Sequence, residues 1–177
     1  MLATLQNARL RLAAHHIQVR PKAWMMGFSA SGMFANRFAL LHPEAVERVA
    51  VGSPGGWPMA PVTRSGGQDL PYPIGCSDLV TLTGKPLQVE EARQIRFFLF
   101  LGDQDDNDSV AYDDGYDAGE RALVHQLFGL TPLERWPKIE KLYKLARMNA
   151  VFSLYPGVAH QLTPEMRADV ARFFLNP

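Results

Sequence analysis

The sequence has 177 residues, of which 47% are hydrophobic and 20% charged, so the chain is long enough to bury the core of one domain. Its 18 basic and 18 acidic residues balance and no basic face stands out, which argues against nucleic acid as a partner. The single cysteine, Cys76, excludes an internal disulfide and a thiolate metal site. The pair His15-His16 has no third ligand at a suitable spacing, so we expect no metal.

The N-terminal stretch is amphipathic and has no apolar run of signal-peptide type. Leucines and alanines in residues 1 to about 15 recur at helical spacing, with Arg9 and Arg11 on the wetter side. We expect a helix here that covers one face of a sheet. No apolar run in the chain approaches the roughly 20 residues that span a bilayer. A cytoplasmic protein is therefore expected, and a secreted one if the natural N-terminus lies upstream of Met1.

Strands and helices then alternate. A first strand begins near Ala23, runs into a turn of small residues at 27–32, and is followed by a helix that ends before Pro43, because proline cannot continue it. Residues 46–51 predict a second strand. Two further strands are expected over 95–101 and 149–155, and further helices over 118–128, from Thr131 and from Thr163. Such alternation predicts an α/β fold with a mostly parallel sheet and flanking helices.

Two local patterns refine this prediction. Thr131 can cap the helix that follows it, with Glu134 completing a capping box. Residues 53 to about 93 have no periodicity and are rich in glycine and proline, which favours a lid or specificity loop. Its aromatic residues Trp57 and Tyr72 indicate that this segment packs against the rest of the domain.

Three of the predicted strands end in residues whose side chains can take part in catalysis. Ser29 lies at the apex of the small-residue turn, an acidic cluster spans 103–108, and His160 follows the last strand. In parallel sheets, ligands bind outside the carboxyl ends of the strands. A serine hydroxyl needs a base to become a nucleophile, an imidazole can take its proton, and a carboxylate can orient the imidazole. Ser29 is therefore the candidate nucleophile.

The order serine, acid, histidine and the turn sequence resemble the C-terminal half of an α/β-hydrolase of the esterase, lipase and polyester-depolymerase-like group. The family motif is G-x-S-x-G, and residues 27–31 read Gly-Phe-Ser-Ala-Ser, so that a serine replaces the second glycine. The resemblance implies Ser29 as nucleophile, Asp105 as the acid three residues past Gly102, and His160 as base. It also implies the Ala30 amide as an oxyanion donor and no cofactor.

Some assignments stay open at this point. Ser31 is an alternative nucleophile, and Asp106 or Asp103 could replace Asp105 as the acid. For the substrate pocket the candidates are Phe28, Trp57 and Tyr72.

The family places about four strands before the nucleophile strand, where this sequence has room for one helix only. We therefore expect residues 1–177 to form a single, partial α/β-hydrolase domain that lacks the N-terminal strands and the second oxyanion donor. A sheet edge left open in this way could pair with a second copy, giving a homo-oligomer. The function expected is a serine hydrolase that cleaves small-molecule carboxylic esters through an acyl-enzyme. The alternatives are a serine peptidase of the same fold and a non-catalytic remnant.

Overall fold

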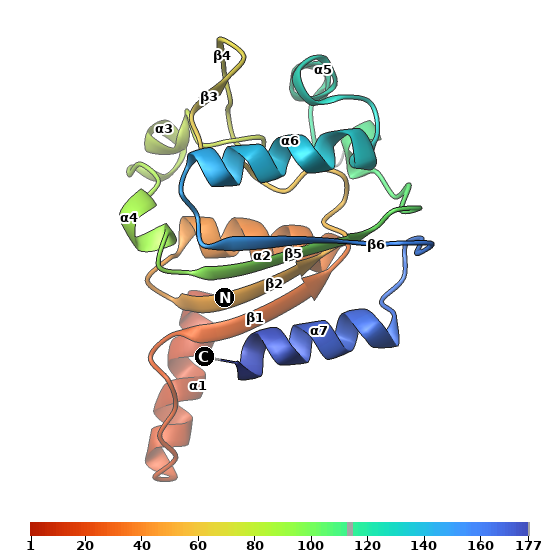
Figure 1. Ribbon diagram of the computed structural model, residues 1–177. Coiled ribbons are helices and arrows are strands. Elements are labelled where there is room, and N and C mark those ends of the chain that lie inside the picture. The colour runs from red at the N-terminus through yellow and green to blue at the C-terminus, as the bar shows by residue number, and fades with distance from the viewer. Residues whose placement is uncertain (113–114, 177) are drawn as a thin grey trace.

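The computed structural model describes residues 1–112 and 115–176, and its centre is a twisted four-stranded sheet with helices on both faces (Figure 1). The sheet consists of β1 (Ala23–Phe28), β2 (Val46–Gly52), β5 (Arg96–Gly102) and β6 (Ala150–Tyr155). Its strand order is β1-β2-β5-β6, and all three pairings are parallel. The predicted parallel α/β fold and its four strands are confirmed.

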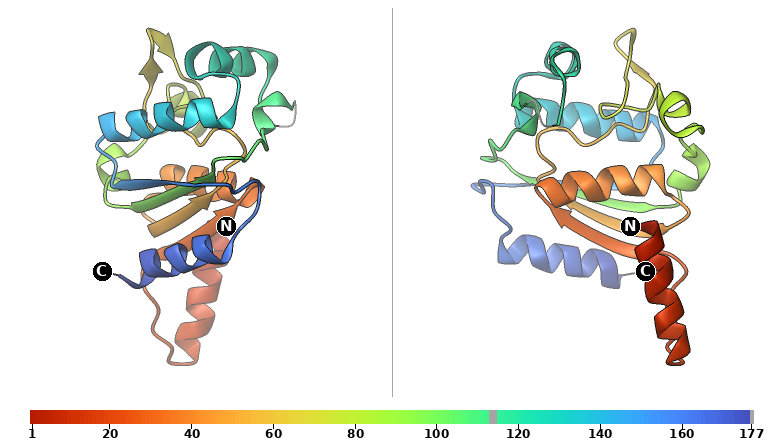
Figure 2. Two further views of the ribbon diagram at one scale, coloured as in Figure 1. Left: turned by 45° about the vertical axis from the view of Figure 1, so that its right-hand side comes forward. Right: turned by 180° about the vertical axis from the view of Figure 1, so that it is seen from behind.

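Two helices cover one face of the sheet and one helix covers the other. α2 (Ala30–Leu41) and α6 (Pro132–Leu145) lie on the first face, and α7 (Pro164–Leu175) lies on the second (Figures 1 and 2). The remaining helices are α1 (Leu2–Ala14), α3 (Leu79–Thr83), α4 (Val89–Ala92), η1 (Ser109–Ala111) and α5 (Ala118–Phe128). Because the four strands of this sheet are parallel, their carboxyl ends meet at one edge.

The core has two parts because both faces of the sheet are buried. The central strand β5 is apolar on both sides, as parallel strands usually are. On one face Phe97 and Leu99 join the larger cluster under α2 and α6, and on the other Phe98 and Phe100 join Met166 and the rest of a smaller cluster under α7. The helix predicted from Thr163 therefore packs back on the sheet as expected.

The helix starts follow the local sequence, with one exception. The Thr131 side chain accepts a hydrogen bond from the Glu134 N–H at 3.2 Å, as predicted. The Glu134 carboxylate, however, accepts from the Leu130 N–H instead of the Thr131 N–H, so the expected capping box is only half formed. A complete capping box occurs at α5, between Asp117 and Glu120.

The N-terminal helix does not cover the sheet, which corrects the expectation from its amphipathic pattern. None of the residues of α1 is buried, and the helix projects away from the sheet (Figures 1 and 2). The side of β1 that faces away from β2 has no strand partner among the residues described.

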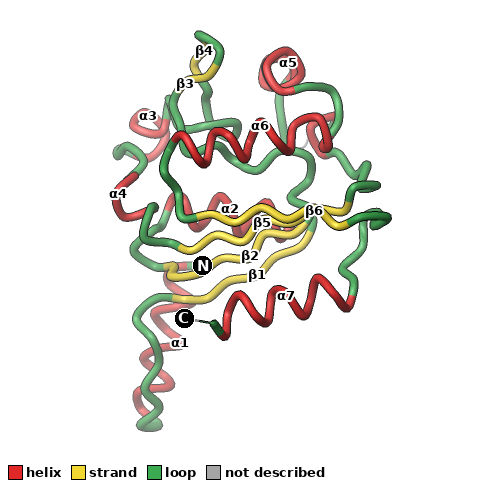
Figure 3. The backbone as a smooth tube through the Cα atoms, in the orientation of Figure 1, coloured by secondary structure: helices red, strands yellow, loops and turns green. Residues whose placement is uncertain are grey.

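The segment 53–93 is more ordered than its composition suggests. It contains the short antiparallel strands β3 (Arg64–Ser65) and β4 (Gln68–Asp69) and the short helices α3 and α4 (Figure 3). Trp57, Met59 and Ile74 are fully buried, so the prediction that this segment packs against the domain is confirmed.

Candidate active site

Ser29 is the single residue between the end of β1 and the start of α2. Its backbone has φ 59° and ψ −129°, a conformation that is energetically unfavourable for any residue other than glycine. The Ser29 N–H donates to the Gly52 carbonyl at 2.9 Å, which continues the pairing of β1 with β2 by one residue. The chain therefore turns from strand to helix within one strained residue, and its hydroxyl is left at the carboxyl edge of the sheet.

The turn is possible only because two neighbouring positions lack side chains. A Cβ added at Gly27 would lie 2.1 Å from the Ser31 carbonyl oxygen, and one added at Gly32 would lie 2.5 Å from the Gly52 carbonyl oxygen. Real Cβ atoms essentially never approach other atoms within 3.0 Å. Close packing of β1, α2 and β2 thus explains the small residues around Ser29.

The hydroxyl of Ser31, the alternative nucleophile, forms hydrogen bonds with the backbone of the last residue of β1. It donates to the Phe28 carbonyl at 2.7 Å and accepts from the Phe28 N–H at 2.9 Å. The serine that replaces the second glycine of the motif therefore ties the first turn of α2 to the strand. No hydrogen bond joins its hydroxyl to His160, whose ring nitrogens bond to Asp105 and Ser29.

His160 lies in the loop between β6 and α7, and its ring joins Ser29 to Asp105. The distance from His160 Nε2 to Ser29 Oγ is 3.0 Å, and His160 Nδ1 lies 3.1 and 3.0 Å from Asp105 Oδ1 and Oδ2. An ionised carboxylate can only accept, so Nδ1–H donates to Asp105 and Nε2 is free to accept the Ser29 hydroxyl proton. Residues from three strand ends thus form one hydrogen-bonded chain.

Of the three candidate acids, Asp105 meets the histidine. Its side chain is 1% exposed and also accepts the Asn107 N–H at 3.0 Å. Asp106 is exposed, and Asp103 instead accepts the Gly157 N–H at 2.7 Å. The structure therefore places neither alternative acid at His160.

The loops that carry the acid and the histidine are bonded to each other. The Asp103 N–H donates to Tyr155 O at 3.0 Å, and the Gln104 N–H donates to Val158 O at 2.9 Å. A Cβ at Gly102 would lie 2.0 Å from that same Val158 oxygen, so only glycine permits this approach. The two loops consequently hold Asp105 and His160 at a fixed separation.

A buried ion pair anchors the far end of the acid loop. Arg135 on α6 is 1% exposed, and its Nη1 donates to Asp108 Oδ1 at 2.8 Å. The same guanidinium donates to the carbonyls of Gly129 and Leu130, at 2.9 and 2.8 Å. Asp108 in turn caps η1 by accepting the Val110 N–H. The sequence gives no sign of this contact, because its partners are 27 residues apart.

The three predicted pocket residues have different environments. The Phe28 ring packs against the His160 ring, with centroids 5.1 Å apart, so it supports the histidine. Trp57 corrects the prediction: it is 0% exposed, stacks on Phe128 and donates its indole N–H to the Ile74 carbonyl, which makes it a core residue. Tyr72 does line a pocket, of about 320 Å³, which also includes Ala30.

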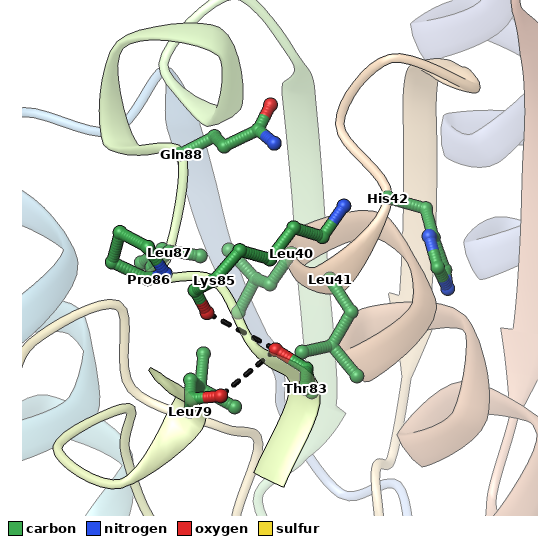
Figure 4. Close-up of a pocket in the computed structure, with 9 residues that line it drawn as sticks. All are labelled: Leu40, Leu41, His42, Leu79, Thr83, Lys85, Pro86, Leu87 and Gln88. Carbon is green, nitrogen blue, oxygen red and sulfur yellow. Dashed lines mark hydrogen bonds between the residues drawn. The ribbon is translucent and has the colours of Figure 1, made fainter. Parts of the chain in front are cut away.

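A second, smaller pocket of about 80 Å³ is lined mainly by apolar side chains, among them Leu40, Leu79 and Leu87 (Figure 4). It lies at the end of α2 opposite to Ser29, and the Thr83 hydroxyl beside it donates to the Leu79 carbonyl at 2.8 Å. This pocket is therefore separate from the hydrogen-bonded chain at the sheet edge.

Within residues 1–112 and 115–176, no three His, Cys, Asp or Glu side chains are grouped so that they could hold a metal ion. In the same part of the chain, no helix has both the length and the apolar character that a bilayer span requires.

The sequence matches no protein-family model and no curated protein, but the structure resembles solved hydrolases. A poly(aspartic acid) hydrolase from Sphingomonas sp. KT-1 matches 97% of the chain at 19% identity with a TM-score of 0.61. A poly(3-hydroxybutyrate) depolymerase from Bordetella parapertussis matches 97% at 16% identity with a TM-score of 0.60. A putative dienelactone hydrolase from Klebsiella pneumoniae subsp. pneumoniae matches 98% at 15% identity with a TM-score of 0.51.

This chain has the fold of the α/β-hydrolases. It spans 60% of the first of these proteins, 56% of the second and 58% of the third, so it holds a part of the α/β-hydrolase fold as those proteins have it. The part that matches includes the carboxyl edge of the sheet, where α/β folds bind their ligands and where Ser29 lies.

Proposed function

We propose that the chain is a serine hydrolase that cleaves carboxylic esters through an acyl-enzyme. The observation that carries the proposal is the continuous hydrogen-bonded chain from Ser29 Oγ through His160 to Asp105. The strained turn at Ser29 supports it, because such strain collects at functional sites. The solved structures reported above are hydrolases and a depolymerase, which supports hydrolysis as the reaction class.

The proposed acylation begins at the Ser29 hydroxyl. As Oγ attacks the ester carbonyl carbon, its proton passes to His160 Nε2, 3.0 Å away, and the carbonyl oxygen becomes an oxyanion. Asp105 stabilises the imidazolium through the Nδ1–H bond, from a position almost closed to water. Collapse of the tetrahedral intermediate breaks the bond to the alcohol oxygen, which takes the proton from His160.

Deacylation repeats these steps with water in place of the serine. His160 takes a proton from a water molecule as that water attacks the acyl carbon, and then returns the proton to Ser29 Oγ. The products are a carboxylic acid and the free enzyme. No cofactor enters either half of the reaction as proposed.

The Ala30 N–H is the proposed oxyanion donor within this chain. α2 begins at Ala30, and the first N–H groups of a helix have no partner inside it, so they and the helix dipole favour negative charge. In the α/β-hydrolase fold a second donor comes from a loop after an earlier strand. Loss of one such donor costs roughly 10²- to 10³-fold in rate.

Covalent labelling tests the proposal. The purified chain is treated with a fluorophosphonate probe after its folding has been checked by circular dichroism, and Ser29→Ala and Ser31→Ala are treated in parallel. We expect labelling in the parent chain and in Ser31→Ala, and none in Ser29→Ala. A folded parent chain that takes up no probe would instead favour a non-catalytic remnant. Comparison of a p-nitrophenyl ester with a p-nitroanilide of the same acid then separates an esterase from a peptidase.

A further inference from the structure

A pocket of about 320 Å³ extends from the candidate nucleophile turn along α2. Its lining includes Ala30, Phe34, Arg37 and Phe38 from this helix, with Tyr72 from the segment 53–93. A volume near 300 Å³ is at the lower end of the range for small-molecule sites. Because Ala30 directly follows Ser29, an ester placed for attack at Ser29 has this pocket as its neighbour.

Arg37 is the arginine of this pocket, and no carboxylate among residues 1–112 and 115–176 pairs with its guanidinium. Its Nη2 donates to the Tyr116 hydroxyl at 3.1 Å, and the guanidinium stands 5.7 Å from the ring centroids of Tyr72 and Tyr116. The Nε atom is buried without a hydrogen-bond partner. Arg135, by contrast, is matched by Asp108.

A half-buried cation in apolar surroundings favours an anion that completes its hydrogen bonds. Burial of a polar group without a partner costs free energy, and a guanidinium binds a carboxylate through two parallel N–H groups. Arg37 lies seven residues after Ala30, which corresponds to about 10 Å along the axis of α2 at roughly 1.5 Å per residue. The charge thus lies about two helical turns from the proposed oxyanion donor.

We propose that Arg37 selects esters that carry a carboxylate, with the apolar spacer of the substrate lying along α2 between Ala30 and Arg37. The proposed class includes esters with the carboxylate in the acyl part and esters with it in the alcohol part. This inference rests on the proposed function, since it names the substrate class of the same site.

Matched substrates test the inference on the acyl side. The half-ester p-nitrophenyl hydrogen suberate and the neutral p-nitrophenyl octanoate have the same acyl length and leaving group. Their kcat/KM values are compared in the parent chain, in Arg37→Gln, in Arg37→Lys, and in Arg11→Gln on the exposed α1 as a control. On the alcohol side, 4-acetoxybenzoate is compared with phenyl acetate in the same way.

The quantity compared is the ratio of kcat/KM for the charged ester to kcat/KM for the neutral ester of a pair. In at least one of the two pairs, we expect this ratio to fall about 10-fold or more in Arg37→Gln, because the variant loses the charge-assisted hydrogen bonds to the carboxylate. Arg37→Lys should retain part of the preference, and Arg11→Gln all of it. If Arg37 only supports Tyr116, both esters of a pair will slow equally and the ratio will not change. An unchanged ratio in both pairs overturns the inference, while hydrolysis of the neutral esters still supports the proposed function.

A binding measurement covers the case in which no ester is hydrolysed, which would count against the proposed function alone. Monomethyl suberate and free 4-hydroxybenzoate are titrated calorimetrically into Ser29→Ala and into the double variant Ser29→Ala, Arg37→Gln. Binding of either probe that weakens about 10-fold in the double variant supports the inference. Absent binding, or equal binding to the two proteins, overturns it.

Discussion

Replacement of Gly27 by alanine tests the packing that places Ser29 at the sheet edge. The added Cβ would lie 2.1 Å from the Ser31 carbonyl oxygen and 2.6 Å from the Gly32 nitrogen, both backbone atoms of α2. Ordinary contacts begin near 3.4 Å, so β1 and α2 have to separate by about 1 Å. We expect the free energy of unfolding to fall by about 1–3 kcal/mol, the usual cost of overpacking.

The same displacement moves Ser29 relative to His160, whose contact is now 3.0 Å. A misplacement of about 1 Å costs roughly 100-fold in rate, so p-nitrophenyl butyrate hydrolysis should fall by about that factor. Urea unfolding and initial rates are measured for Gly27→Ala and for the control Gly115→Ala, whose added Cβ would have its nearest neighbour at 3.9 Å. The reasoning is refuted if Gly27→Ala keeps the unfolding midpoint and the rate of the parent chain.

Three further predictions concern the acid, the buried ion pair and the cysteine. Asp105→Asn should lower kcat by about 10⁴-fold while Asp106→Asn changes it less than about twofold, and the reverse order would reassign the acid. Arg135→Met leaves the largely buried Asp108, 15% exposed, without its ion-pair partner and should cost about 3–5 kcal/mol in urea unfolding, whereas a loss below about 1 kcal/mol would contradict the anchoring role of this ion pair. Burial raises the pKa of the Cys76 thiol from 9.0 to about 11, with a smaller contribution from the charge of a nearby carboxylate. The folded chain therefore keeps a proton that the unfolded chain loses, so the free energy of unfolding should fall between pH 9 and 11, by about 2 kcal/mol at pH 10.5, and less in Cys76→Ala.

The sheet could be predicted from sequence because its signals are local. The apolar run that forms β5 and the proline that ends the helix after Ser29 depend on neighbouring residues only, and both predictions are confirmed. The meeting of Ser29, Asp105 and His160 could also be anticipated, since parallel strands bring their carboxyl ends to one edge. Topology thus predicted the proximity of residues 131 positions apart in the chain.

Other features could not be predicted because they depend on distant partners. The amphipathic pattern of residues 2–14 predicted a covering helix, but nothing in the pattern specifies a surface for it, and α1 has none of its residues buried. Trp57 looked suitable for a pocket, yet its burial is decided by Phe128, 71 residues later. The ion pair of Arg135 with Asp108 likewise joins segments whose sequences carry no sign of each other.

The smaller core cluster under α7 has a consequence for the regulation of activity by local motion. His160 lies four residues before α7, and this helix is held by a few aromatic contacts, such as Phe98 with Phe173, and by Arg48, which donates to the carbonyls of Phe173 and Phe174. Segments with small cores can open while the rest of a protein stays folded. Transient undocking of this helix would carry the imidazole away from the serine and return it on closing, so the hydrolase we propose could be switched off reversibly without loss of its sheet.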